Sequence, residues 1–153
     1  MTVSRLHSIA AGAFVTGAIL AAAIGDGPSL PDARITPGAI ATTSAQEVCM
    51  TDGRSGSAYS RLHRHTTYET RLTVLRAYGV SLRSADDFEL DHLVPLCLGG
   101  ADRPANLWPE AWGEARQKDR LEARMCRKVC EGAMRLVDAQ HWFLGNAWAK
   151  DIR

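Results

Sequence analysis

An aspartate and a histidine stand side by side in the middle of the chain, and an asparagine follows 14 residues after the histidine. These residues are Asp91, His92 and Asn106. A histidine titrates near neutral pH, so His92 can serve as a general base. The Asp91 carboxylate offers hard oxygen ligands of the kind that magnesium and manganese prefer. Together these residue types could activate a water molecule beside a bound cation.

The surrounding pattern predicts the elements that must position these side chains. Residues 88–98 are the first convincing strand region, and a Gly-Gly pair at 99–100 then makes a turn. Residues 106–108 form a second short strand, which Pro109 ends. Neighbouring residues on a strand face opposite sides. Asp91 and His92 can therefore reach one site only if the strand twists or bulges there.

Helices are predicted on both sides of this strand pair. Thr66 or Thr67 can cap a helix that runs to Tyr78. Residues 113–130 show a helical repeat with apolar residues every four positions, and residues 136–149 form a last helix. The middle of the chain therefore runs in the order strand, turn, strand, helix.

This order resembles the HNH, or ββα-metal, nuclease motif, and more narrowly a group of exported HNH-like proteins. Three segments carry the resemblance: Asp-His-Leu-Val-Pro-Leu-Cys-Leu-Gly-Gly from residue 91, Asn-Leu-Trp-Pro from residue 106 and Lys-Asp-Arg-Leu-Glu from residue 118. With a Pro-Asp-Ala-Arg-Ile-Thr-Pro-Gly-Ala lead-in from residue 31, it covers residues 31–149. It implies an α+β fold in which a two-stranded hairpin and a helix are flanked by further helices and stapled by disulfides.

The resemblance also implies a function, that of a metal-dependent endonuclease hydrolysing phosphodiester bonds with low sequence specificity. Asp91 would bind one divalent cation, with magnesium or manganese preferred and zinc or nickel as alternatives. His92 would take a proton from the attacking water, and Asn106 would brace the loop and orient His92. The cation would stabilise charge on the phosphorane and the departing oxygen. The expected partner is nucleic acid, with DNA preferred over RNA, and the protein is expected to be a monomer.

One position departs from the HNH pattern, which places a further metal ligand on the helix. Ala115, or Arg116 in a shifted count, stands there, and neither binds a metal well. Asp119 and Glu122 follow on the same helix face, and either could supply the missing oxygen. They could equally be a helix-dipole partner and an i, i+4 partner of Lys118.

The helix also carries basic residues, although the formal net charge of the chain is only +1. Arg116, Lys118 and Arg120 could lie along a phosphate backbone, or they could form a solvated face. Two alternatives to the nuclease therefore stay open. One is a degenerate HNH-like module that binds nucleic acid without cutting it, and the other is a structural secreted protein.

The N-terminus predicts export. Residues 1–23 combine a basic start, an uncharged apolar run and small residues near Ala23, as a signal peptide does. A membrane anchor is the alternative, but the run is shorter than the ~20 residues of a spanning helix. Residues 24–47 then form an extended lead-in, and residues 48–153 form the HNH-like domain. The mature protein would be secreted or held in the cell envelope or periplasm, without stable membrane association.

Four cysteines suit disulfides in an exported protein, with a zinc site as the alternative. Spacing alone leaves three pairings open. Proteins of the resembling group often carry Glu at the position of Cys97 and His at that of Cys126, which implies that these two sites are neighbours. The resemblance therefore implies the pairs Cys97–Cys126 and Cys49–Cys130.

Overall fold

A computed structural model describes residues 30–50 and 56–152 of the protein. The expected signal peptide lies outside the described residues. The sheet consists of β1 (Phe88–His92) and β2 (Leu107–Ala111). The helices are α1 (Ala45–Cys49), α2 (Ser57–His63), α3 (Tyr68–Ala77), α4 (Trp112–Cys130) and α5 (Leu136–Leu144). The fold class is therefore α+β, as expected.

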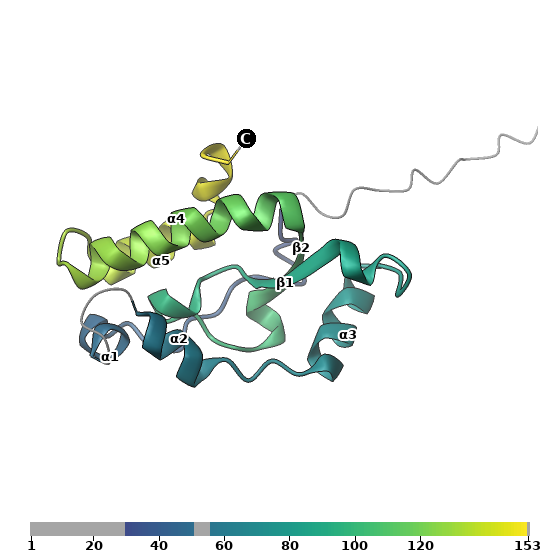
Figure 1. Cartoon of the computed structure of the whole chain (residues 1–153), viewed down its shortest axis with the longest axis horizontal. Coiled ribbons are helices and arrows are strands. Elements are labelled where there is room, and N and C mark those ends of the chain that lie inside the picture. Colours follow the sequence, from purple (N-terminus) through teal and green to yellow (C-terminus); the bar gives the residue numbers. More distant parts are fainter. Residues whose placement is uncertain (1–29, 51–55, 153) are drawn as a thin grey trace, which may run out of the picture.

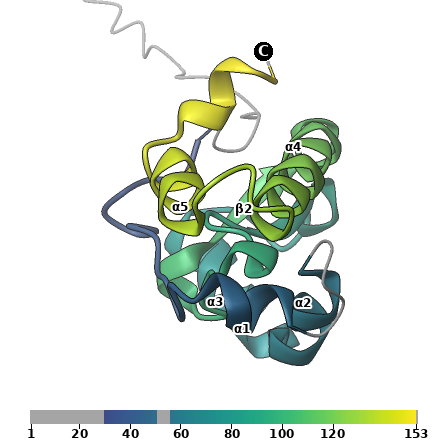
Figure 2. The same cartoon turned by 90° about the vertical axis from the view of Figure 1, so that its left-hand side faces the viewer.

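The elements form three layers. Figures 1 and 2 show α4 and α5 on one side of the hairpin, and α1, α2 and α3 on the other. The hairpin and the loop between its strands lie in the middle layer. No helix in the described part of the chain is both long enough and apolar enough to cross a membrane.

The two strands pair antiparallel, and β2 continues through the proline that was expected to end it. Leu90 faces Pro109 in the register. Just beyond the strands, the N–H of Leu93 donates to the carbonyl of Asn106 at 2.8 Å. Hydrogen-bonded pairs alternate with non-bonded pairs in an antiparallel ladder, so Leu90 and Pro109 form a non-bonded pair. A proline costs no ladder bond at such a position.

The first strand is shorter than its apolar run suggested. β1 ends at His92, and the chain then turns into a 3₁₀ helix at Leu96–Leu98. Pro95 precedes that turn and cannot donate a ladder bond. Its carbonyl instead accepts hydrogen bonds from the N–H groups of Leu98 and Gly100. The predicted strand over residues 88–98 is therefore half strand and half turn.

The helices follow their sequence signals in part. Thr67 caps α3 by accepting a hydrogen bond from the N–H of Thr70, as predicted. The predicted helix over residues 136–149 ends instead at Leu144, because Asn146 adopts a left-handed backbone with φ of 53°. A 3₁₀ helix, Ala147–Lys150, follows that break. Helix α2 was not among the predicted elements.

The segment before α1 is part of the fold rather than a lead-in. Thr36 and Ala39 are buried, and Ile40 forms a β-bridge with Gly100. The hydroxyl of Thr36 donates to the carbonyl of Leu107 at 2.7 Å. Folded structure therefore begins upstream of the expected boundary at residue 48.

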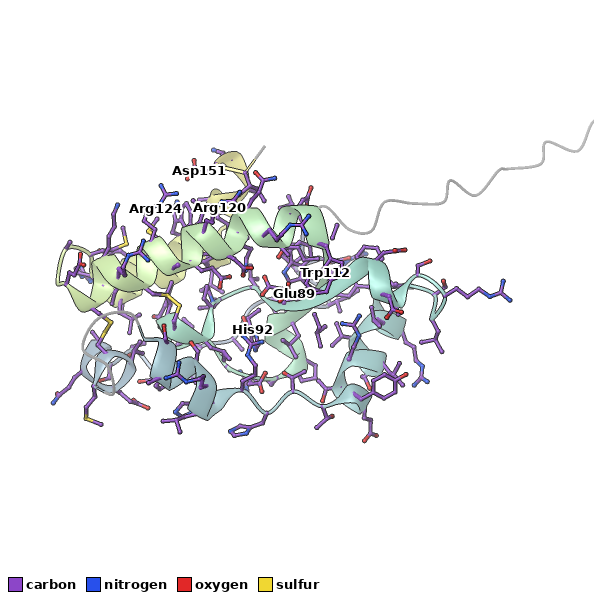
Figure 3. The ribbon with its side chains drawn as sticks, in the orientation of Figure 1. Glu89, His92, Trp112, Arg120, Arg124 and Asp151 are labelled. Carbon is purple, nitrogen blue, oxygen red and sulfur yellow. A yellow bond between two sulfur atoms is a disulfide. The ribbon has the colours of Figure 1, made fainter. Side chains whose placement is uncertain are left out.

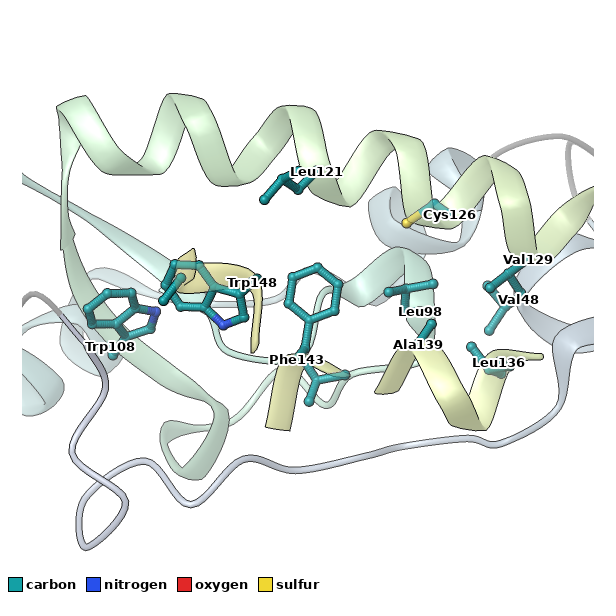
Figure 4. Close-up of a cluster of buried hydrophobic side chains, with 12 residues drawn as sticks. Val48, Leu98, Trp108, Leu121, Cys126, Val129, Leu136, Ala139, Phe143 and Trp148 are labelled. Atoms are coloured by element: carbon teal, nitrogen blue, oxygen red, sulfur yellow. The ribbon is translucent and has the colours of Figure 1, made fainter. Parts of the chain in front are cut away.

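The core lies between α4, α5 and the middle layer (Figure 4). α4 contributes Leu121 and Val129, α5 contributes Leu136 and Phe143, and two tryptophans complete one end, Trp108 and Trp148. Two disulfides tie α4 to the rest of the chain, Cys49–Cys130 and Cys97–Cys126, with Cα–Cα distances of 5.5 and 5.8 Å. The pairing implied by the resemblance is thus confirmed.

Candidate active site

Asn106 holds the loop between the strands together from inside. Its Oδ1 accepts from the N–H groups of Val94 and Ala39 at 3.0 and 3.3 Å. Its Nδ2 donates to the carbonyls of Val94 and Ala101, both at 2.9 Å. The side chain is fully buried and uses all four of its hydrogen-bonding positions. The geometry is that of a brace, which is the role the resemblance implied.

The turn after β1 requires a glycine for reasons of space. A Cβ atom at Gly100 would lie 1.9 Å from the carbonyl oxygen of Val94 and 3.0 Å from Nδ2 of Asn106. No side chain fits at that distance. Gly100 therefore allows the backbone to approach close enough for Asn106 to bridge it.

Asp91 and His92 point to opposite faces of the hairpin, because the strand register runs without a bulge. Asp91 faces α4, where its Oδ2 lies 2.5 Å from Nζ of Lys118. The ring of His92 instead contacts Asp102, in the loop before β2. The side chains expected to share one site are therefore separated by the strand. Only the backbone carbonyl of His92 reaches the Asp91 side, where it accepts from Lys118 at 2.8 Å.

His92 is held by a carboxylate that sequence reasoning did not single out. Its Nε2 lies 2.8 Å from Oδ1 of Asp102. Asp102 also accepts from the backbone N–H of His65 and the hydroxyl of Thr66. Burial lowers the pKa of His92, although the Asp102 partner opposes that shift. The hydrogen bonds to Asp102 outweigh its own desolvation and lower its pKa. At neutral pH a neutral imidazole thus faces an ionised carboxylate.

Lys118 is not on the basic surface where the sequence analysis placed it. Its side chain is 0% exposed. The ammonium lies 2.5 Å from Oδ2 of Asp91 and 2.5 Å from Oε1 of Glu122. It also lies 5.5 Å from the ring centres of Phe143 and Trp148. Burial alone would lower the pKa of Lys118, but the attraction of Asp91 and Glu122 outweighs it and raises the pKa.

The same attraction acts on the two carboxylates. Burial would raise the pKa of Asp91, but Lys118 outweighs it and keeps the pKa below its usual value. Burial raises the pKa of Glu122 to about 7, against the opposing charge of Lys118. A charged lysine thus binds both Asp91 and Glu122, the residues expected to hold a metal.

The remaining candidates on α4 lie outside this contact. Ala115 is buried, while Arg116, Asp119 and Arg120 are exposed. Figure 3 shows Arg120 on α4, away from His92. Asp119 and Glu122 line a hollow of about 380 Å³ between α2 and α4. Its other lining residues are Ser57, Ser60, Cys97, Ala123, Cys126 and Arg127.

Glu110 belongs to the buried acidic group and was not predicted. It lies on the same hairpin face as Asp91, is 0% exposed, and has no hydrogen-bonding neighbour other than Asp91 in the described part of the chain. Burial, reinforced by the Asp91 carboxylate, raises the pKa of Glu110 to about 10. The sequence did carry one indication of this position. Glu110 stands two residues after Trp108, so both side chains lie on one face of the strand.

The arrangement does not fit a divalent cation while Lys118 is in place. The oxygens of Asp91, Glu122 and the His92 carbonyl already surround the ammonium. Among residues 30–50 and 56–152, no three His, Cys, Asp or Glu side chains are placed to hold a metal ion. The site therefore consists of a neutral histidine–aspartate pair on one hairpin face and a lysine-centred acidic group on the other.

Comparison of the chain with protein-family models, with curated proteins and with solved structures finds no match.

Proposed function

We propose that the chain is an exported endonuclease of the HNH type, hydrolysing phosphodiester bonds in nucleic acid with low sequence specificity. One observation carries the proposal. His92 ends a short strand, its ring is held by Asp102, and Asn106 fixes the backbone that follows it. A braced histidine at the end of a hairpin, with a helix packed on that hairpin, is the frame that the sequence resemblance implied.

The histidine–aspartate pair has the chemistry of a general base. An ionised Asp102 accepts a hydrogen bond from the Nε2–H of His92, so the lone pair of the neutral ring resides on Nδ1. That nitrogen can take the proton of an attacking water molecule. Asp102 would stabilise the imidazolium formed, as a carboxylate partner does in other histidine bases. The His92 residue is only 2% exposed, so a substrate would have to reach a nearly buried ring.

The outer face of α4 supplies charge for a phosphate backbone. Arg116, Arg120 and Arg124 are exposed at i, i+4 spacing, and Trp112 continues the row with 46% exposure. None of these arginines forms an ion pair with the described residues. Unpaired arginines can neutralise phosphates, and an exposed aromatic ring can stack on a base.

The test is a nicking assay on supercoiled plasmid with the disulfide-bonded protein, in the presence and absence of magnesium and manganese. Because a positioned base contributes about 10²–10⁴-fold to a rate, His92→Ala should lower nicking by at least that lower factor. His141→Ala is the matched control, since His141 is an exposed histidine on α5. A folded His92→Ala protein that nicks at the wild-type rate would remove His92 from the mechanism.

A second function is favoured by Lys118, which neutralises the two carboxylates expected to bind the catalytic metal. The chain would then bind nucleic acid without cutting it. Fluorescence anisotropy with a labelled oligonucleotide tests this. The double variant Arg116→Ala with Arg120→Ala should weaken binding. The slope of the logarithm of the binding constant against the logarithm of the salt concentration should become shallower by about two. Arg76→Ala, an exposed arginine on α3, is the control. Binding by a protein that never nicks favours this function over the nuclease.

A further inference from the structure

The acidic cluster, which we define as Asp91, Glu110 and Glu122, lies between the hairpin and α4 and encloses one ammonium group. Nζ of Lys118 is 2.5 Å from Asp91 and from Glu122, and 2.8 Å from the backbone carbonyl of His92. An ammonium group has three protons to donate. The three oxygens therefore use the full donor capacity of Lys118, so its charge is held at a single point.

Two further contacts fix the ammonium at that point. The rings of Phe143 and Trp148 each lie 5.5 Å from Nζ, and both rings are buried. A cation is attracted to the face of an aromatic ring at this distance, and more strongly when water is excluded. Leaving the site would cost Lys118 its three hydrogen bonds and both ring contacts.

The cluster holds one more acid than the ammonium satisfies. Glu110 is fully buried next to Asp91, and in the described part of the chain its carboxyl group has no hydrogen-bonding neighbour other than Asp91. Buried polar atoms without partners are rare in folded proteins. The cluster therefore holds one carboxyl group that Lys118 does not bind.

We propose that Lys118 is the resident cation of the acidic cluster, and that removing its ammonium group turns the cluster into a divalent-cation site. Asp91, Glu122 and the His92 carbonyl, the three groups that hold the ammonium, would be ligands, and water would complete the coordination shell. Calcium accepts oxygen ligands in flexible geometry, whereas magnesium demands near-ideal octahedral geometry, so this irregular set of oxygens suits calcium better.

An entry path for the cation already exists. Glu122 lines the hollow between α2 and α4, its side chain is 18% exposed, and Asp119 lies beside it on the wall. A cation attracted to these two carboxylates would reach Glu122 first. In the native protein it would meet Lys118 behind Glu122, and like charges would keep it out. The native site consequently uses a side chain where a metal enzyme uses an ion.

The experiment measures cation binding without any nucleic acid, so its result is independent of whether the protein is a nuclease. Wild type, Lys118→Ala and the control Lys128→Ala, an exposed lysine on the same helix, are titrated with calcium, manganese and magnesium chloride in a calorimeter. Thermal unfolding is recorded at each cation concentration. Only Lys118→Ala should show cation binding at the cluster. Its unfolding temperature should rise by about 5 °C or more at saturating calcium.

Two variants assign the binding to the cluster. Lys118→Ala combined with Glu122→Gln should lose the calcium response. Cation binding by wild type that Asp91→Asn abolishes would overturn the proposal, since the ammonium would then not exclude the ion. A folded Lys118→Ala protein with no cation response would also overturn it. So would a Lys118→Ala protein that stays unfolded at every calcium concentration, because a bound cation must stabilise the fold.

Discussion

Oδ1 of Asp102 lies 2.8 Å from Nε2 of His92, and the same carboxylate accepts hydrogen bonds from His65 and Thr66 in the segment before α3. Asp102 therefore joins the candidate base to the outer layer of the fold. It sets the position of the imidazole ring and also which ring nitrogen carries the proton.

Asp102→Asn tests both consequences of this link. The variant keeps the shape of the side chain but loses its charge, so the hydrogen bonds from His65, Thr66 and His92 weaken. We expect the free energy of unfolding to fall by about 1–3 kcal/mol. If His92 is the base, nicking should fall as well. Urea denaturation measures the first effect, with Asp138→Asn, an exposed carboxylate on α5, as the control. Unchanged stability would show that the link carries no net energy.

Asn106→Asp isolates the donor half of the brace. The carboxylate can still accept from Val94 and Ala39, but it cannot donate to the carbonyls of Val94 and Ala101. It also buries a charge beside two carbonyl oxygens. We expect a loss of about 3 kcal/mol or more in unfolding free energy. Asn106→Ala, which removes all four bonds, should be at least as damaging. A variant with wild-type denaturation would refute the bracing role.

Glu110 predicts a particular dependence of stability on pH. Its pKa is about 10 in the folded protein, against 4.5 as the ordinary value. Below pH 4.5 the Glu110 carboxyl is protonated in both the folded and the unfolded state, so it costs the fold no stability. As pH rises toward the folded pKa, only the unfolded state releases the proton, so stability falls by up to about 1.4 kcal/mol per pH unit.

Glu110→Gln removes that titration and nearly keeps the shape. We expect the variant to be more stable than wild type by at least about 1 kcal/mol in mildly alkaline buffer, with a flatter pH profile. Denaturant unfolding across neutral and alkaline pH provides the comparison, and Glu131→Gln, an exposed position, is the control. Parallel profiles for wild type and Glu110→Gln would mean that Glu110 is ionised in the folded protein.

The two disulfides should contribute comparable stability. They close loops with sequence separations of 81 and 29 residues, and the shorter loop lies inside the longer one. In the loop-entropy description each is worth about 3.5–4.5 kcal/mol. Cys49→Ser with Cys130→Ser, and Cys97→Ser with Cys126→Ser, should each lower unfolding free energy by about that amount. Denaturation under non-reducing conditions measures it. A pair whose removal leaves stability unchanged would be redundant for the fold.

The sequence predicted the frame around the site better than its interior. Thr67 as a helix cap, the hairpin and the helix after it each follow from short-range signals that act within a few residues. The role of Asn106 and both disulfide pairings followed from the resemblance. The metal roles of Asp91, Asp119 and Glu122 and the nuclease activity stay predictions.

The interior could not be predicted because it depends on contacts across the fold. Lys118 stands three residues after Ala115 and three before Leu121, so its spacing does place it on the buried face of α4. A lysine is almost never fully buried without a partner, however, so sequence alone favours a surface position. The partners of Lys118 are Asp91 on β1 and Glu122, which lies one turn further along α4. Their combination exists only after α4 packs on the hairpin.

The outer edge of β2 is closed against strand pairing. Pro109 has no N–H to offer, and its position in a non-bonded pair turns that missing donor away from β1. Next to it, the carbonyl of Leu107 already accepts from Thr36. An open strand edge can template pairing with a second molecule, and proline and covering segments are common ways to prevent this. The hairpin is thus protected along β2 from edge-to-edge association, which would help an unpartnered chain to remain dispersed at high concentration.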